Sequence, residues 1–513
     1  MSTAVPRRRP GSSRAIALLD PGLQGPRKVV LCGVPLRRGA SIKSALALLS
    51  LAACTSFNSG PVNVVVIGDP PRIVDADAQP MGPTDAVLTG AVAQGLVRLD
   101  AGGQIVPGLA ERWNVSDDGL SYIFRMGDAR WPDGKRVTPR AVVRQLRAAA
   151  APGGRNPLRG VLTGIEEIVA TANVIEIRLA APRPNLLHHL ARPELAIIED
   201  GAGAGPFGVR RDGHGHLRLV RSVPDGEAER EETVVLAAHR AAIAVALFDQ
   251  GSADLVLGGT ANDLPVARAA DPPAAALRFD PAAGLFGLAV VDTDGPLANP
   301  DLRRALSMAV DRDALTAAIG PEGLQPRSTL TARGLSNLPA PAEPGWAAFP
   351  LDARIAEARR LVGTAGPLQR SIRVAIPAGP GFRLLFAHLR RDWARIGIDA
   401  VRVDVSRNAD LRLVDEVAPS RGASWYLERF TCDRAPVCDP NADAALAASR
   451  TARDPAARVG HLAAADRLLA EAVPFIPLTT PVRWSLVSRR ITGFRTNPFA
   501  VHSLTDLVVP RAR

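Results

Sequence analysis

A glycine-rich run at residues 203–208 has the GxGxxG spacing of a dinucleotide-binding loop. In such sites the loop opens a helix, whose first N–H groups receive the pyrophosphate. Here the run follows a predicted strand at Leu195–Ile198 and precedes a charged, glycine-containing turn at Arg210–His216, where no helix pattern begins. The run therefore predicts a tight turn and no nucleotide cofactor.

Two further motifs have residue types suited to nucleophilic or metal chemistry. Gly422 and Ser424 begin a G-x-S-x-G pattern, but Tyr426 stands where the closing glycine belongs. His214 and His216 could form a metal pair, although a polar hairpin tip is the simpler interpretation. The sequence contains no P-loop and no HExxH motif. We therefore expect a protein that is not an enzyme and that holds no metal or cofactor.

Most of the positive charge lies near the N-terminus. The 513 residues carry a formal net charge of +11, from 62 Lys and Arg against 51 Asp and Glu. Residues 1–53 hold nine of these bases and one of the acids, so the remainder has 53 bases and 50 acids. A nearly balanced body without a basic stripe argues against nucleic-acid binding.

The basic N-terminal region has the features of an export signal. Three basic residues between positions 37 and 43 precede Ala45–Ala53, an apolar run too short to span a bilayer. The run ends in Leu-Ala-Ala-Cys54, which resembles a bacterial lipobox, where Cys54 would become the lipidated first residue. The alternative is an ordinary signal peptide cleaved just before Cys54. Both predict export to the periplasm or cell surface, with residues 1–54 as the signal and 55–61 as a tether.

Two of the four cysteines, Cys432 and Cys438, belong to the predicted folded body. Five residues, one of them a proline, lie between these cysteines, and exported proteins form disulfides. A two-cysteine metal site would need further ligands nearby, which the sequence lacks. We therefore expect a local disulfide between Cys432 and Cys438, which would stabilise the fold by about 2 kcal/mol.

The stretch 95–151 has the clearest pattern of secondary structure. Asp100–Gly103 supplies the tight turn of a first hairpin, because adjacent glycines adopt positive φ. A second hairpin pairs Trp113–Ser116 with Leu120–Met126. Thr138 can then cap a helix that begins with proline, a residue whose missing N–H costs nothing at that position.

At these residues the chain resembles a known family. The order of turns, together with spaced identities that include Trp113, Asp117–Gly119 and Trp131, is similar to the extracellular solute-binding family 5, the solute-binding proteins of ABC importers for peptides and nickel. In a second segment, Asn299–Asp313, Asn299 is predicted to cap one helix and Asp311 the next, and this segment also resembles the family. The resemblance extends over about Val62–Asp506.

The resemblance implies an α/β fold with two lobes, the class II periplasmic-binding-protein type, with an extra subdomain in the first lobe. The first lobe would cover 62–282, with 89–199 as the extra subdomain, and would be completed by 483–513. The second lobe would cover 283–482. Such lobes close over a ligand, and binding favours closure only through contacts made to both.

The resemblance also points to Asp410–Cys438, which corresponds to the ligand-holding stretch of peptide-binding relatives. The candidates are charged and aromatic residues of this stretch and one tryptophan after a late strand: Asp415, Glu416, Trp425, Tyr426, Arg429 and Trp484. The acids could pair with an ammonium group and the arginine with a carboxylate, while the aromatic rings could wall a pocket. The family's usual "DYPDP"-like run is missing here, so no acid is carried over with certainty. Packing or a surface ion pair is the alternative for each residue.

The family resemblance implies the extracytoplasmic component of an ABC importer, which binds a peptide or similar small solute and delivers it to permease subunits in the inner membrane. Cys54 would add contact with membrane lipid. The alternatives left open are a nickel, opine or sugar-type solute, and a receptor or chaperone role without transport. The eight histidines form no compelling nickel cluster.

Overall fold

The computed structural model describes residues 60–151, 153–211, 216–364 and 371–509. The predicted export signal with Cys54, most of the tether, and His214 lie outside these residues. None of the described helices is long and apolar enough to cross a membrane.

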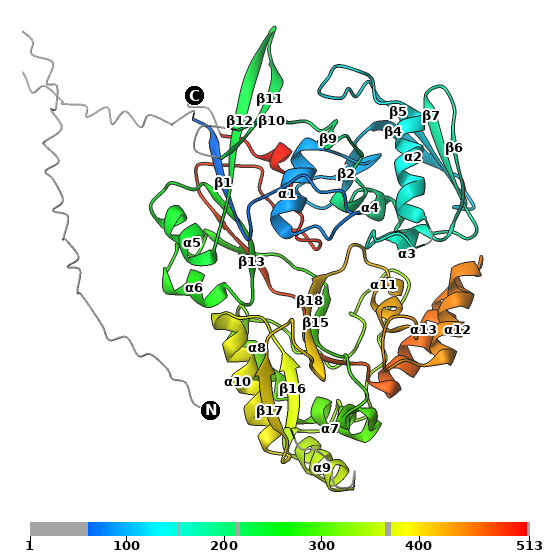
Figure 1. Cartoon of the computed structure of the whole chain (residues 1–513), viewed down its shortest axis with the longest axis vertical. Helices are drawn as coiled ribbons and strands as arrows, with labels where there is room; N and C mark the ends of the chain where they lie inside the picture. The colour runs from blue at the N-terminus through cyan, green and yellow to red at the C-terminus, as the bar shows by residue number, and fades with distance from the viewer. Residues whose placement is uncertain (1–59, 152, 212–215, 365–370, 510–513) are drawn as a thin grey trace, which may run out of the picture. The chain divides into compact units, whose positions relative to one another are not determined.

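A seven-stranded sheet forms the centre of the first lobe (Figure 1). The apolar segment at the start of the body forms its central strand, β1, which pairs in parallel with β12 on one side and with β13 on the other. In spatial order the strands are β10 (Gly208–Arg211), β11 (Leu217–Asp225), β12 (Ala228–His239), β1 (Val62–Ile67), β13 (Leu255–Thr260), β20 (Arg483–Val487) and β14 (Leu277–Phe279). The helices that flank this sheet are α1 (Pro83–Val92), α5 (Ala241–Asp249) and α6 (Leu264–Ala269).

A second, four-stranded antiparallel sheet carries the second of the predicted hairpins and has its own hydrophobic core. Its spatial order is β4 (Ala110–Val115), β5 (Ser121–Met126), β7 (Val174–Leu179) and β6 (Ile165–Ala170), beside the hairpin of β2 (Val97–Leu99) and β3 (Ile105–Pro107). The helices here are α2 (Pro139–Ala150), α3 (Arg159–Leu162), α4 (Leu186–Leu190) and the 3₁₀ turn η1 (Pro193–Leu195). Both predicted hairpins are confirmed. The Thr138 cap is confirmed as well, since its Oγ1 accepts from the Ala141 N–H at 3.3 Å.

The predicted turn at 203–208 is also explained by packing. The short strands β8 (Ile198–Glu199) and β9 (Ala202–Gly203) pair with each other, and the next described element is strand β10. A Cβ on Gly203 or Gly205 would come within 2.3 Å of Ala93 or Val92 at the end of α1. The glycines therefore permit close backbone approach to α1. The predicted strand at Leu195–Ile198 is wrong over most of its length, because η1 ends at Leu195 and pairing begins only at Ile198.

The second lobe is built on a five-stranded mixed sheet. Its spatial order is β17 (Asp399–Val403), β16 (Ser371–Ala375), β18 (Leu411–Val417), β15 (Gly284–Val290) and β19 (Phe475–Thr479). Its helices are α7 (Pro300–Ala309), α8 (Arg312–Ile319), α9 (Leu351–Thr364), α10 (Pro380–Ala394), α11 (Ser424–Leu427) with the 3₁₀ turn η3 (Glu428–Phe430), α12 (Pro440–Thr451) and α13 (Pro455–Ala472). Figure 1 shows α12 and α13 side by side. The predicted caps at Asn299 and Asp311 are confirmed by their bonds to the N–H groups of Asp301 and Ala314.

The chain passes between the two large sheets twice. It leaves the seven-stranded sheet after β14 and enters the five-stranded sheet at β15, and it returns between β19 and β20. The fold is therefore α/β with two lobes, the first of which is completed by the C-terminal part of the chain. The expected lobe limits at 282 and 482 fall in these two crossing segments.

Candidate functional site

Two cavities lie where the lobes meet. The first, which we call the cleft cavity, has a volume of about 330 Å³ and is lined by first-lobe residues, which include Arg483, together with Glu416 and Val417 of the second lobe. The second, the hinge cavity, has a volume of about 740 Å³ and is lined by both crossing segments, by the loop at 321–329, and again by Arg483.

The cleft cavity lies at the carboxyl ends of parallel strands. Val66 stands near the end of β1, and Leu257 and Gly258 stand where the parallel pairing of β13 with β1 ends. Loops that follow parallel strands meet at this edge of a sheet, which is where open α/β sheets bind ligands. The seven-stranded sheet therefore positions one wall of the cavity, and the end of β18 forms the opposite wall.

Asp415 joins the two lobes through Arg483. The Arg483 guanidinium donates to the Asp415 carboxylate at 2.7 Å and to its carbonyl oxygen at 3.0 Å. Burial raises the pKa of Asp415, and the charge of Arg483 acts in the opposite direction. The Asp415 carboxylate is thus already engaged by a partner from β20. Its predicted role toward a ligand ammonium stays a prediction.

Glu416, the neighbouring acid, faces the cleft cavity and has a side chain that is 44% exposed. It forms an ion pair with Arg429, whose guanidinium lies 5.0 Å from the ring centre of Trp425. Burial lowers the pKa of Arg429 to about 10. The structure therefore brings Glu416, Trp425 and Arg429 into one chain of contacts beside the cleft cavity.

The other two aromatic candidates are buried. Tyr426 packs in the second-lobe core, where burial raises its pKa to about 12, and its hydroxyl has no hydrogen-bond partner among the described residues. Trp484 is 1% exposed and donates its Nε1–H to the Thr260 carbonyl at 2.8 Å. Its indole covers Gly259, where a Cβ would come within 2.2 Å of the ring. Neither side chain lines the cavities described above, and ligand contact by either one stays a prediction.

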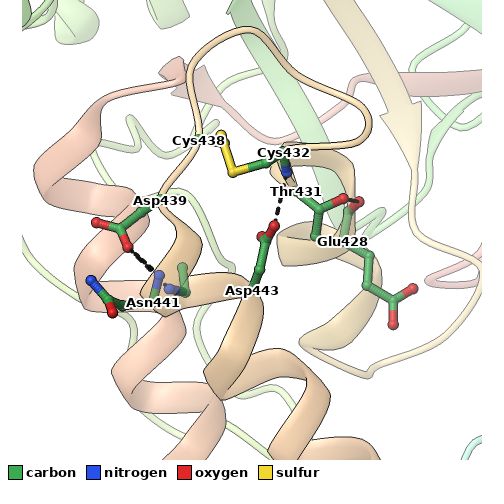
Figure 2. Close-up of a disulfide and its surroundings, with 8 residues drawn as sticks. Glu428, Thr431, Cys432, Cys438, Asp439, Asn441 and Asp443 are labelled. Atoms are coloured by element: carbon green, nitrogen blue, oxygen red, sulfur yellow. Dashed lines mark hydrogen bonds between the residues drawn. A yellow bond between two sulfur atoms is a disulfide. The ribbon is translucent and has the colours of Figure 1, made fainter.

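The structure joins Cys432 and Cys438 in a disulfide beside the start of α12 (Figure 2). Their Cα atoms lie 5.1 Å apart. The Cys432 N–H donates to an Asp443 carboxylate oxygen at 3.0 Å, and Asp439 caps α12 through the Asn441 N–H at 2.7 Å. The loop that follows η3 is therefore fixed to the helix that follows it.

The end of β18 has one open edge. β15 pairs with β18 over its full length, whereas β16 pairs only with the first two residues, Leu411 and Arg412. Among the described residues, no strand pairs with Leu413–Val417 on that second side.

The direction of the backbone groups follows from the register. The Ala418 N–H donates to the Ala283 carbonyl at 2.8 Å, so the backbone groups of Glu416, two residues earlier, also face β15. Those of Asp415 and Val417 face the open edge, in agreement with the bond from β20 to the Asp415 carbonyl. Because Val417 lines the cleft cavity, this edge offers peptide-group donors and acceptors to a ligand there.

Comparison with known proteins identifies the family. Residues 104–426 match the family described as bacterial extracellular solute-binding proteins, family 5 (middle). This chain belongs to that family. Its members are solute-binding proteins, which agrees with a site made of two interlobe cavities.

Individual relatives of this family 5 protein match over most of their length. The periplasmic oligopeptide-binding protein OppA of Haemophilus influenzae is 22% identical over 467 residues, which cover 78% of this chain and 85% of that protein. The murein tripeptide-binding protein MppA of Escherichia coli has the same fold, with a TM-score of 0.76 and 19% identity over 88% of this chain and 99% of that one. The H. influenzae OppA structure, a complex with the peptide RPPGFSPFR, has a TM-score of 0.75, 17% identity, and coverages of 88% and 99%.

The family 5 site contains charged residues that the sequence analysis missed. Arg98, Arg192, Glu194 and His502 line the cleft cavity. Arg192 pairs with Glu194 at 3.4 Å, and Arg98 donates to Thr505 at 3.3 Å. These side chains come from β2, from η1 and the residue before it, and from the C-terminal segment, and no local motif marks them. They could be identified only from the three-dimensional fold, which brings these distant segments together at the cavity.

The hinge cavity adds a buried cation. Arg327 lines this cavity and donates to the Gly284 carbonyl at 2.7 Å, while its Nε and Nη1 have no partner among the described residues. Burial lowers the pKa of Arg327 to about 10. In the described part of the chain no cluster of three His, Cys, Asp or Glu side chains is placed to hold a metal ion.

Proposed function

We infer that this family 5 protein binds short peptides in the cleft cavity and delivers them to the permease of an ABC importer. The open edge of β18 is the observation that carries the proposal. A free strand edge recognises an extended peptide through its main chain, and the pockets beside it accept side chains. The edge between Leu413 and Val417 has this geometry and ends at the cavity wall.

The charges near the edge suit a peptide terminus. Glu416 lies on the open-edge segment of β18 and is partly exposed to the cavity. A ligand ammonium near Glu416 would compete with Arg429 for the carboxylate, and the displaced guanidinium would retain its contact with the Trp425 ring. We therefore assign ligand contact first to Glu416 and the open edge, with Trp425 and Arg429 behind them and Asp415 as the link between the lobes.

Relatives support a peptide as the solute. The two solved structures described above are named as a tripeptide-binding protein and as a peptide complex. In this proposal the first lobe comprises 62–282 and 483–513, the second comprises 283–482, and a peptide favours closure because it contacts both. The protein would work in the periplasm or at the cell surface, and a lipid anchor at Cys54 would hold it near the permease.

Native mass spectrometry of the chain expressed without residues 1–54, followed by calorimetric titration with defined peptides, tests the proposal. We expect co-purified peptides and saturable one-to-one binding. N-acetylated peptides should bind about tenfold or more weakly, because they lack the ammonium group that Glu416 would meet. A Glu416→Gln variant should lose this discrimination.

The matched control is Asp404→Asn, which removes an exposed second-lobe carboxylate that follows β17 and lines neither the cleft cavity nor the hinge cavity. Its discrimination between free and acetylated peptides should equal that of the wild type. An empty protein that binds no peptide in either measurement would refute the proposal and favour a non-peptide solute or a receptor role.

A further inference from the structure

A third, smaller cavity lies between the lobes and is distinct from the two already described. This junction cavity has a volume of about 70 Å³. The first lobe contributes the segment Pro182–His189, and the second contributes parts of Ser420–Glu428, the end of α12 and Arg458. A space of this size holds several water molecules or one small oxyanion.

The charges around the junction cavity do not balance. Three guanidinium groups, those of Arg183, Arg450 and Arg458, line it together with one carboxylate, that of Glu428. Arg450 pairs with Glu428 at 3.4 Å, and Arg458 donates to the carbonyl of Ala452 at 2.8 Å. Two positive charges are left without a carboxylate among the residues that line this cavity.

Arg183 is the least satisfied of the three. Its Nε is buried and has no hydrogen-bond partner in the described part of the chain. Burial lowers the pKa of Arg183; Glu428 opposes this shift, and Arg450 and Arg458 add to it. A buried guanidinium surrounded by like charges is costly unless an acceptor reaches it.

The position of Arg183 is fixed by its surroundings. Its carbonyl oxygen accepts from the Tyr122 hydroxyl at 3.0 Å, and its guanidinium lies against Gly164, where a Cβ would come within 2.1 Å of Nη2. The guanidinium is therefore held in place beside the cavity, ready to meet an anion without a large loss of side-chain entropy.

We propose that the junction cavity binds one small oxyanion, a phosphate or carboxylate group, between Arg183 of the first lobe and Arg450 and Arg458 of the second. Arginines bind oxyanions through paired N–H groups, and the three here come from both lobes. The bound anion would neutralise the excess charge and would favour the closed arrangement.

The anion and the transported solute should bind cooperatively. Residues between 182 and 189 and between 420 and 428 line the junction cavity, and the adjoining stretches 191–196 and 416–417 line part of the cleft cavity. A ligand in either cavity therefore bridges the two lobes through neighbouring parts of the same two segments, so each ligand favours the arrangement that the other needs. By linkage, the anion must raise solute affinity by the same factor as the solute raises anion affinity.

Calorimetric titration of the chain lacking residues 1–54 with inorganic phosphate, at constant ionic strength and without peptide, tests the site. We expect saturable one-to-one binding that weakens about tenfold or more in Arg183→Gln. Gly164→Ala should also weaken it, because the added methyl group displaces the guanidinium while its charge remains. Glu428→Gln should strengthen binding, since it removes the one negative charge.

Arg407→Gln is the charge-matched control, because Arg407 is exposed and does not line the junction cavity. Its phosphate affinity should equal that of the wild type. Absence of saturable binding, or equal losses in Arg183→Gln and Arg407→Gln, would overturn the proposal. A failure of peptide binding would leave this measurement intact, because no peptide is present in it.

A second titration identifies the source of the oxyanion. If free phosphate is the ligand, its presence should raise wild-type affinity for a peptide and leave that of Arg183→Gln unchanged. If the carboxylate belongs to the bound peptide, amidation of the peptide C-terminus should weaken wild-type binding as much as Arg183→Gln does, with no further loss when the two are combined. Two results together would contradict both sources of the oxyanion: losses of affinity from peptide amidation and from Arg183→Gln that simply add, and a peptide affinity that phosphate does not change.

Discussion

Asp415 and Glu416 are adjacent on β18, yet they meet partners in different places. Side chains of neighbouring strand residues project from opposite faces, so Asp415 reaches Arg483 and Glu416 reaches Arg429. The family resemblance placed this acidic pair in Asp410–Cys438, the stretch predicted to hold the ligand. It could not predict which acid is already neutralised, because Arg483 comes from a strand 68 residues away.

His189, which borders the junction cavity, should make stability depend on pH. Burial lowers the pKa of His189 from its ordinary value of 6.5 to about 3, with smaller contributions of the same sign from His188, Arg192 and Arg183. The folded protein thus disfavours the protonated ring, whereas the unfolded chain takes up a proton below pH 6.5. Stability should be complete above pH 6.5 and fall progressively as the pH drops toward 3.

Urea unfolding at pH 7 and pH 5 measures this effect. The histidine should contribute a loss of about 2 kcal/mol at pH 5, and His189→Gln should remove that part of the pH dependence. At pH 7 the ring is neutral, and the variant loses the 3.4 Å contact with Ser420 together with the packing of the ring. The difference in unfolding free energy between the variant and the wild type at pH 7 therefore measures this loss, and it is subtracted from the difference at pH 5. An identical pH slope in the wild type and the variant would rule out this role for His189.

Many elements could be predicted because their signals are local. Thr138, Asn299 and Asp311 are recognisable caps in sequence, and each caps the expected helix. The glycine pair at Gly203 and Gly205 had no such local explanation, since its cause is the close approach of α1. Elements that depend on their own residues were predictable, and those that depend on a distant neighbour were not.

At the scale of a single strand, β18 offers a direct test of peptide binding along its open edge. Val417→Pro removes an N–H that faces away from β15, so stability should change by about 1 kcal/mol or less, while peptide affinity should fall about fivefold to tenfold. Glu416→Pro removes an N–H that faces β15 and should cost about 1–3 kcal/mol of stability. Urea unfolding and peptide titration of both variants separate the two effects. If Val417→Pro binds peptide like the wild type, the ligand does not add to this edge.

For the molecule as a whole, the discontinuous first lobe was predicted from the family resemblance and could not have been predicted from periodicity. β20 completes the first lobe from the far end of the chain, and Trp484 at its start fills the space left by Gly259. From sequence alone, a tryptophan at the end of a strand can equally line a ligand site or pack in a core. Here the packing role follows from Gly259 on the neighbouring strand, because the absence of a side chain there leaves room for the indole. The contacts between lobes, which define all three cavities, have no local sequence signal.

Lipidation of Cys54 is predicted to attach the whole molecule to the membrane. A lipid on Cys54 followed by residues 55–61 would place the start of β1 within about 29 Å of the membrane, because eight residue steps separate them and each spans at most about 3.6 Å. Each buried methylene of the acyl chains contributes about 0.8 kcal/mol, so two or more chains hold a protein of this size at the membrane. We expect the wild type in the membrane fraction, with an N-terminal peptide that begins at a lipid-modified Cys54.

Cys54→Ser should move the protein to the soluble exported fraction and leave its unfolding curve unchanged, because position 54 precedes the first strand. Cys32→Ser is the matched control, since Cys32 lies within the predicted signal and should have no effect on either property. Fractionation with mass spectrometry of the N-terminal peptide decides the matter. A wild-type protein that is soluble, with an unmodified N-terminus at or near Cys54, would mean that the small residues before it form an ordinary cleavage site.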